Sequence, residues 1–205
     1  MNKLNQALIR QFGNPNGLLG VLAGHIMATR KSNLQRNEWT LRLLELQTTD
    51  QILEIGPGPG VTLQKILAQV TGGKVVALDH SRTMLGQCRR RNHAALREGR
   101  LLLIEGDYVA LGEIEEQFDK IVAVNSLQFD GINEALLTNL HKLLKPGGRL
   151  AITFQPRGKN PTNEAGHEFA SDAGDRLMKS GFETVNIKTL ELQPVHAFCV
   201  LATVT

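Results

Sequence analysis

The segment Ile52–Gly60, with the sequence ILEIGPGPG, restricts the fold of this chain more than any other segment does. Its first residues, Ile52–Ile55, have the pattern of a buried strand, and an amphipathic pattern begins at Val61. The alternate glycines between them allow a sharp turn and remove the side chains that would hold a ligand away. A strand, a glycine loop and a helix in this order build a ligand site at the carboxyl end of a central strand in an α/β sheet.

Glu54, two residues before the first glycine, indicates which ligand this loop suits. The dinucleotide fingerprint G-x-G-x-x-G requires a third glycine where Val61 stands, so the match to it is incomplete. A carboxylate at position 54 repels a pyrophosphate and attracts an ammonium or sulfonium group. The loop therefore favours a cationic nucleoside ligand over a dinucleotide, and a tight turn without a ligand is the competing interpretation.

Apolar runs that alternate with amphipathic segments continue after this loop. Further strands are expected over Lys74–Asp79, Leu101–Ile104, Asp119–Val124 and Arg149–Phe154. Continuous apolar strands that alternate with helices indicate a parallel sheet covered on both faces. Two last strands, Thr184–Leu190 and His196–Thr203, follow each other closely, so they are expected to form an antiparallel hairpin.

Helices are expected before, between and after these strands. Leu18–Thr29 and Asn33–Leu46 precede the first strand, and a shorter helix over Asn2–Gln11 comes before a turn cluster at Phe12–Gly17. The remaining helices are expected over Val61–Val70, from the N-cap Ser81 to Arg97, and over Ala110–Gln117, Ile132–Leu143 and Ala165–Leu177. The sequence Lys145-Pro146-Gly147-Gly148 predicts a turn into the fifth strand.

Two carboxylates end the second and third expected strands, at the same edge of the sheet as the glycine loop. Asp79 can accept hydrogen bonds from ribose hydroxyls, although this role suits NAD as well as an adenosyl compound, and Asp is also common in turns. Asp107, after Gly106, can accept from an adenine amino group. Met84 lies in the first turn of the following helix, where it could contact adenine or belong to the core.

The composition narrows the class of protein. The 205 residues suit a single domain, 1–205, in which residues 1–50 form a helical cap and residues 51–205 form the core. A net charge of +3 and an aromatic content of 4% give little support for nucleic-acid binding. Cys88 and Cys199 lie in apolar patterns typical of buried thiols, and no motif suggests a metal site. No apolar run reaches membrane-spanning length and no signal-peptide pattern is present, so a cytoplasmic protein without stable membrane insertion is expected.

The pattern E-x-G-x-G-x-G that begins at Glu54 resembles motif I of the class I S-adenosylmethionine-dependent methyltransferases. Asp79, Asp107, the Lys145–Gly148 turn and the terminal hairpin match further features of that family, so the resemblance extends over residues 51–205. It implies an α/β fold with a Rossmann-like, doubly wound, seven-stranded and mostly parallel sheet whose last strand is antiparallel. It also implies S-adenosylmethionine as the cofactor.

The resemblance assigns site residues to the ends of four strands. Asn125 and Ser126 end the fourth strand, which in this family faces the methionine part of the cofactor and the reacting methyl group. Asn125 departs from the Asn/Asp-Pro-Pro-aromatic motif of methylases that act on nucleic-acid bases or protein glutamine, which disfavours those acceptors. The implied cofactor-binding residues are Glu54, Gly56, Pro57, Gly58, Gly60, Asp79, His80, Met84, Gly106, Asp107, Tyr108, Asn125 and Ser126. The candidate catalytic residues are Asn125 and the two histidines in regions expected to shape the acceptor pocket, His25 and His167.

These features predict methyl transfer to an oxygen, nitrogen or carbon atom of a small-molecule acceptor, amphiphilic acceptors included, by in-line displacement. Positioning and desolvation can supply much of the rate. Two alternatives stay open: an NAD-dependent oxidoreductase, and a protein that binds an adenosyl ligand without turnover. Glu54, the missing third glycine and the terminal hairpin argue against the first. The second stays open because no general base is identifiable.

Overall fold

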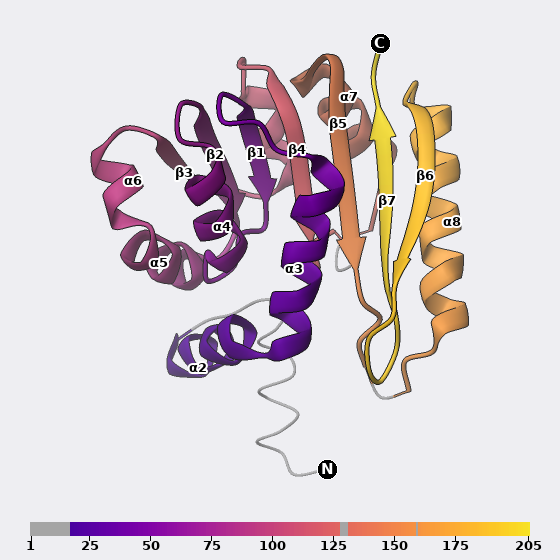
Figure 1. Ribbon diagram of the computed structural model, residues 1–205, viewed down its shortest axis with the longest axis horizontal. Coiled ribbons are helices and arrows are strands. Elements are labelled where there is room, and N and C mark those ends of the chain that lie inside the picture. Colours follow the sequence, from indigo (N-terminus) through magenta and orange to yellow (C-terminus); the bar gives the residue numbers. More distant parts are fainter. Residues whose placement is uncertain (1–16, 128–130, 159) are drawn as a thin grey trace.

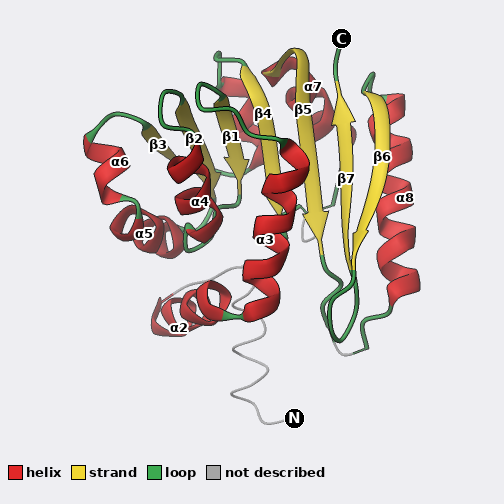
Figure 2. Ribbon diagram, in the orientation of Figure 1, coloured by secondary structure: helices red, strands yellow, loops and turns green. Residues whose placement is uncertain are grey.

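The structure is a computed structural model that describes residues 17–127, 131–158 and 160–205 (Figure 1). The helix expected over Asn2–Gln11, and most of the turn cluster at Phe12–Gly17, lie outside the described residues. In the described part, helices pack on both faces of one mixed sheet (Figure 2).

The sheet has seven strands in the order β3-β2-β1-β4-β5-β7-β6. The first five strands run parallel, and β7 pairs antiparallel with both β5 and β6. The strands are β1 (Gln51–Ile55), β2 (Lys74–Asp79), β3 (Leu101–Glu105), β4 (Phe118–Val124), β5 (Leu144–Phe154), β6 (Glu183–Leu190) and β7 (Ala197–Thr203). This order confirms the expected doubly wound sheet with its last strand inserted antiparallel, and it places the topological switch between β1 and β4, where such sheets bind ligands.

Two hydrophobic clusters, one on each face of the sheet, hold the helices in place. Along β1, Ile52 belongs to the cluster with α3, α4, α5 and α6, whereas Leu53 and Ile55 belong to the cluster with α7 and α8. The helices are α2 (Gly17–Thr29), α3 (Lys31–Leu44), α4 (Val61–Gln69), α5 (Arg82–Arg91), α6 (His93–Arg97), α7 (Glu134–Leu143) and α8 (Asn163–Lys179). Because side chains alternate across a strand, a strand buried on both faces is apolar at nearly every position.

The helix expected from Ser81 to Arg97 is interrupted at Asn92. The Asn92 side-chain amide donates to the carbonyl oxygen of Cys88 at 3.1 Å and to that of Gly60 at 3.2 Å. Asn92 thus satisfies a carbonyl near the end of α5 and also holds the glycine loop. The helix expected over Ala110–Gln117 is instead a 3₁₀ helix, η1 (Tyr108–Glu113), capped by Asp107.

The Lys145–Gly148 segment is part of β5 and does not form a separate turn before it. Leu144 pairs with Phe118 before the register between the strands shifts. The Lys145 ammonium lies 2.9 Å from a carboxylate oxygen of Asp119 on β4, which keeps the segment beside that strand.

The two N-terminal helices lie over the sheet in different ways (Figure 1). α3 crosses the face of the sheet near β4 and β5, while α2 lies near the carboxyl ends of the strands, beside α5. The Gln87 side chain on α5 donates to the carbonyl oxygen of Val21 on α2 at 3.3 Å. Among the described residues, no helix is both long and apolar enough to cross a bilayer.

The buried face of α3 is largely polar and includes only two of the leucines of the helix, Leu41 and Leu44. Leu34 and Trp39 are only half-buried. The buried residues are Asn33, Arg36, Asn37, Thr40, Leu41 and Leu44. The hydroxyl of Thr40 lies 2.8 Å from that of Thr153 on β5, so the first part of α3 meets the sheet through polar groups.

Candidate functional site

The loop after β1 has a backbone that favours glycine. Gly56 and Gly58 have φ angles of 67° and 53°, in the left-handed region. A Cβ atom on Gly56 would lie 2.4 Å from Cβ of Ser126, so the loops after β1 and β4 are in close contact. A Cβ atom on Gly58 would meet no atom of the described residues within 4 Å. The backbone of Gly58 is therefore open to a ligand, and the Gly60 N–H closes the turn by donating to Pro57 O at 2.9 Å.

Glu54 is a buried carboxyl group inside β1, directly before this loop. Its side chain is only 2% exposed, and within the described residues its Oε2 atom has no hydrogen-bond partner. Burial, and secondarily the charge of Asp79, raises the pKa of Glu54 to about 8. A buried acceptor without a donor is costly, so Glu54 is suited to meet an ammonium group of a ligand.

Asp79, at the end of β2, accepts two backbone hydrogen bonds. Its Oδ1 accepts from Ser81 N at 2.8 Å and its Oδ2 accepts from Gly58 N at 3.0 Å. Burial raises the pKa of Asp79, and these two bonds oppose the rise. Each carboxylate oxygen can accept a second hydrogen bond, so Asp79 can hold the loop and still accept from a ribose hydroxyl.

His80 and Met84 follow Asp79 but differ in exposure. The His80 ring is half-exposed, with Nδ1 4.0 Å from Oδ1 of Asp79. Met84 is buried, and its backbone N–H donates to the Ser81 hydroxyl, which caps α5. Met84 therefore packs in the core next to the site, as one of its two sequence interpretations states.

The ends of β3 and β4 are joined across the edge of the sheet. Asp107 is exposed and accepts from Val109 N with its Oδ1 at 2.9 Å. The Tyr108 hydroxyl donates to the carbonyl oxygen of Ser126 at 3.1 Å, and the Ser126 hydroxyl donates to Ile55 O at 2.8 Å. Gly106 is packed closely, because a Cβ there would lie 2.8 Å from Cβ of Ala110.

Asn125 lies at the topological switch with a left-handed backbone, at φ 55°. Its Oδ1 accepts from Gln155 N, just after β5, at 2.8 Å. The structure thus gathers the predicted cofactor-binding residues at the carboxyl ends of β1, β2, β3 and β4, where parallel sheets of this topology bind ligands.

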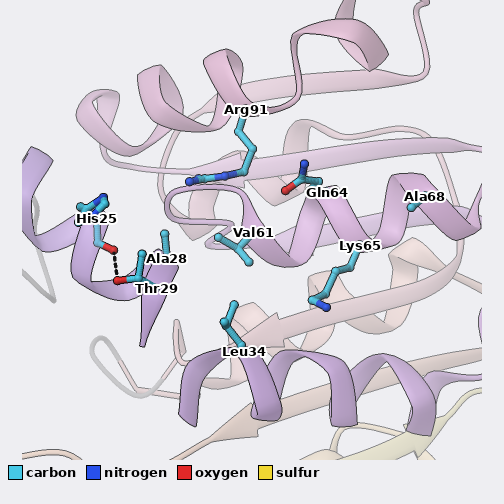
Figure 3. A pocket seen from close by; sticks show the side chains of 9 residues that line it. All are labelled: His25, Ala28, Thr29, Leu34, Val61, Gln64, Lys65, Ala68 and Arg91. Carbon is cyan, nitrogen blue, oxygen red and sulfur yellow. Dashed lines mark hydrogen bonds between the residues drawn. The ribbon is translucent and has the colours of Figure 1, made fainter. Parts of the chain in front are cut away.

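The candidate catalytic histidines lie on different helices. His25, on α2, is exposed and lines a cavity of about 470 Å³ between α2, α3, α4 and α5 (Figure 3). His167, on α8, makes an edge contact with Phe198, at 6.3 Å between ring centroids. Of the described residues, those that line the cavity are His25, Ala28, Thr29, Leu34, Val61, Gln64, Lys65, Ala68 and Arg91. His167 and Asn125 do not line it, so the three candidates do not share this cavity.

Sequence reasoning missed a cluster of polar side chains on the β5 side of Asn125. The cluster consists of Arg36, Gln155 and Arg157. Arg36 is 3% exposed, and its Nη1 donates to Oε1 of Gln155 at 3.0 Å. The signal in the sequence was the helical spacing of Asn33, Arg36 and Thr40 on α3. Because these residues are polar, the spacing indicates a solvent-exposed face rather than a buried one.

Comparisons with known proteins agree with this geometry. The family model described as a methyltransferase domain matches residues 52–148. The chain is 29% identical over 182 residues to the uncharacterized methyltransferase YdaC of Bacillus subtilis, covering 89% of this chain and 97% of that protein. It is also 29% identical over 134 residues to trans-aconitate 2-methyltransferase of Paracidovorax citrulli, covering 65% of this chain and 49% of that enzyme.

Solved structures share the fold. A SAM-dependent methyltransferase from Aquifex aeolicus aligns with a TM-score of 0.70 at 20% identity, covering 90% of this chain and 98% of that one. The N-methyltransferase NodS from Bradyrhizobium japonicum, in complex with S-adenosyl-L-homocysteine, aligns with a TM-score of 0.69 at 16% identity, covering 98% of both chains.

Proposed function

We propose, from the premise that this chain belongs to the class I S-adenosylmethionine-dependent methyltransferases, that it methylates a small-molecule acceptor by in-line displacement. The observation that carries the proposal is the fully buried Glu54, whose Oε2 has no partner among the described residues, beside Asp79 and an open glycine backbone. An ammonium group of an adenosyl amino acid would satisfy that oxygen and favour its ionised form, whereas a pyrophosphate would be repelled by Asp79 and would bring no cation to Glu54.

The residues present fit S-adenosylmethionine, which supplies a methyl group already activated by its sulfonium sulfur. Glu54 would hold the amino group, Asp79 a ribose hydroxyl and Asp107 the adenine amino group. The hydrogen bonds of Tyr108 and Ser126 fix the loop after β4 against the end of β1. The work of these residues is to bind, orient and exclude water, which can provide much of the rate when the leaving group is activated.

The small size of the acceptor is supported by the N-terminal helices and by the relatives. α2 lies near the carboxyl edge of the sheet, where an acceptor would have to enter, and α3 starts directly after α2 and crosses the face of the sheet (Figure 1). One relative is named for trans-aconitate, which is a small acid. Val21 and Leu22 are exposed on α2, which keeps an amphiphilic acceptor within the proposal. A cytoplasmic location belongs to the same proposal, because Cys88 and Cys199 are free, buried thiols.

Calorimetry tests the proposal. The protein should bind S-adenosylmethionine and S-adenosylhomocysteine but not NAD, and Asp107→Ala should weaken that binding roughly tenfold or more. Asp175→Ala, which removes an exposed carboxylate from α8, is the matched control and should bind as the parent does. Transfer of a labelled methyl group from the donor to a small molecule of a cell extract tests turnover. NAD binding without adenosyl binding would contradict the proposal.

A further inference from the structure

Two arginine side chains meet beside the carboxyl end of β5, at a distance from the glycine loop. Nη2 of Arg36 donates to Oδ1 of Asn33 at 3.1 Å, and Nη2 of Arg157 donates to the same oxygen at 2.9 Å. Arg36 also donates to the Gln155 side chain. Two guanidinium groups thus converge on one neutral amide oxygen, and the side chains that hold them come from α3 and from the segment after β5.

This pair has no negative partner in the part of the chain that the structure describes. Neither Arg36 nor Arg157 forms an ion pair there, and Nε of Arg36 has no hydrogen-bond partner. Burial, followed by the charges of Arg157 and Arg30, lowers the pKa of Arg36 to about 9. Burial and then Arg30 lower the pKa of Arg157 to about 10. A buried charge is normally paired, so the buried Arg36 guanidinium, with the exposed Arg157 beside it, is a positive charge without a negative partner among the described residues.

The position of the pair relates it to methyl transfer. Gln155, which accepts from Arg36 with its side chain, donates from its backbone N–H to Oδ1 of Asn125 at 2.8 Å. Asn125 ends β4 at the topological switch, while the cofactor-binding carboxylates lie at β1, β2 and β3. The arginines therefore lie on the side of Asn125 away from those carboxylates, where an acceptor would have to sit. Arg36 is buried and Arg157 is exposed, which gives the pair an inner and an outer member.

We propose that Arg36 and Arg157 bind an oxyanion of the methyl acceptor, a carboxylate or a phosphate, so that this protein methylates anionic small molecules. A guanidinium presents parallel N–H donors that match both groups, and such charge-assisted bonds are the strongest in proteins. An oxyanion bound there would give an acceptor to Nε of Arg36, which has none among the described residues, and would offset the repulsion between the two cations. This assignment rests on the proposed function, because it identifies the acceptor of that reaction.

A purely structural role is the competing explanation. In it, Arg36 only ties α3 to the segment after β5 through Gln155 and Asn33. That role accounts for Nη1 and Nη2 of Arg36. It does not explain why Nε of Arg36 has no hydrogen-bond partner within the described structure, nor why a second guanidinium donates to the same amide oxygen.

The test uses the full chain, saturated with S-adenosylhomocysteine, and two probes, inorganic phosphate and succinate, titrated at constant ionic strength. Binding of at least one probe, measured by calorimetry, should weaken by about 10- to 100-fold in Arg157→Gln and in Arg36→Lys, as expected for a lost charged hydrogen bond. Arg97→Gln, which removes an exposed arginine on α6, is the matched control and should bind the probe as the parent does. Which probe binds distinguishes a carboxylate site from a phosphate site.

The outcomes separate this inference from the proposed function. Arg157 is exposed, so Arg157→Gln should fold. This variant therefore tests the site even if a change at the buried Arg36 prevents folding. Equal probe binding by parent, Arg157→Gln and Arg97→Gln, or no probe binding by the parent, overturns the oxyanion site. Failure of S-adenosylhomocysteine to bind the parent overturns the proposed function instead. Once transfer is detected, an anionic acceptor should be methylated faster than its neutral amide by the parent, and Arg157→Gln should reduce that preference by raising KM more than it lowers kcat.

Discussion

The backbone N–H of Gly58 donates to Oδ2 of Asp79 at 3.0 Å, which ties the loop after β1 to the last residue of β2. The other oxygen of the same carboxylate accepts from Ser81 N, at the start of α5. Asp79 thus orders two segments of the proposed cofactor site, the glycine loop and the start of α5, without any bound ligand. The sequence offers ribose binding and a turn role as alternatives for Asp79, and the two backbone hydrogen bonds give it a structural role whether or not it binds ribose.

Asp79→Ala should therefore weaken both the fold and the site. It leaves the N–H groups of Gly58 and Ser81 without their acceptor, which should cost about 1–3 kcal/mol of unfolding free energy, measured in urea. Asp79→Asn keeps one side-chain acceptor and should lose less. Asp107→Ala should reduce S-adenosylhomocysteine affinity with a smaller change in stability, because Asp107 is exposed. Unchanged stability in Asp79→Ala would contradict the double role.

Glu54 should make stability fall as pH rises. Its pKa is raised to about 8 in the folded chain, against about 4.3 when unfolded. Between these values the folded protein keeps a proton that the unfolded chain releases, so stability declines across that window. Glu54→Gln cannot ionise, so its unfolding free energy relative to the parent should increase from about pH 5 to about pH 8.

Urea unfolding at both pH values checks this, with Glu116→Gln, an exposed carboxylate after η1, as the control that should show no such trend. A constant difference between Glu54→Gln and the parent across the window would show that Glu54 titrates normally. Binding gives a second readout. Near neutral pH, the parent should release close to one proton when S-adenosylmethionine binds, because an ammonium at Glu54 favours the ionised carboxylate. Glu54→Gln should release less.

Alanine substitutions at Gly56 and Gly58 should lower stability by different amounts, although both residues have a left-handed backbone. Gly58→Ala should introduce only the left-handed strain, about 1–2 kcal/mol, because no atom in the part of the chain that the structure describes lies within 4 Å of the new Cβ. Gly56→Ala adds the contact with Ser126 at 2.4 Å and should be clearly less stable in urea. Combining Gly56→Ala with Ser126→Gly should cost less than the sum of the two single changes, since the clash is removed. Equal stability of the two alanine variants would mean that the loops after β1 and β4 separate freely.

Much of the fold was predictable because its signals are local. The strands β2 and β3 contain continuous apolar runs, Val75–Leu78 and Leu101–Ile104, and the short connection before β7 requires a hairpin. The break at Asn92 was not predictable in this way. Asn92 ends α5 because its amide reaches the carbonyl of Gly60, a contact between residues far apart in the chain.

The candidate site likewise has residues that the sequence predicts and residues that it does not. The glycine loop and the strand-end carboxylates follow from spacing, since parallel strands bring their carboxyl ends together. The Arg36–Arg157 pair does not, because its members approach each other only when α3 lies across β5. A polar stripe on a helix reads as solvent-exposed unless the sheet end that it meets is also polar, as Thr153 and Gln155 are here.

Asn125 should matter for turnover through its side chain rather than through its backbone. Asn tolerates the left-handed conformation, and Gly tolerates it better, so Asn125→Gly removes the acceptor for Gln155 N without adding strain. Asn125→Ala removes the same acceptor and adds strain, so only the alanine variant should lose about 1–2 kcal/mol of stability from strain. Both should lose turnover comparably, by up to about a hundredfold, because the end of β4 loosens. Parent-like turnover in Asn125→Gly would exclude a role for the side chain.

The last prediction concerns a general base. His25 and His167 lie on different helices, and only His25 lines the cavity between α2 and α4 in the described structure. A positioned base contributes about 10²–10⁴-fold, whereas proximity and desolvation can contribute as much without a titrating group. An acceptor that is already a free amine or an enolate needs little help from a base. Alanine at either histidine should therefore lower turnover by at most about a hundredfold.

Turnover of each histidine variant, measured at saturating donor with an identified acceptor, checks this expectation. His93→Ala, an exposed change on α6, is the control that should leave turnover unchanged. A loss above roughly a thousandfold at His25 alone, with S-adenosylhomocysteine affinity unchanged, would establish an essential base there. It would also place the reacting acceptor atom in the cavity beside α2. The same loss at His167 alone would place that atom on the side of β7, next to Phe198, because the two histidines do not share a cavity.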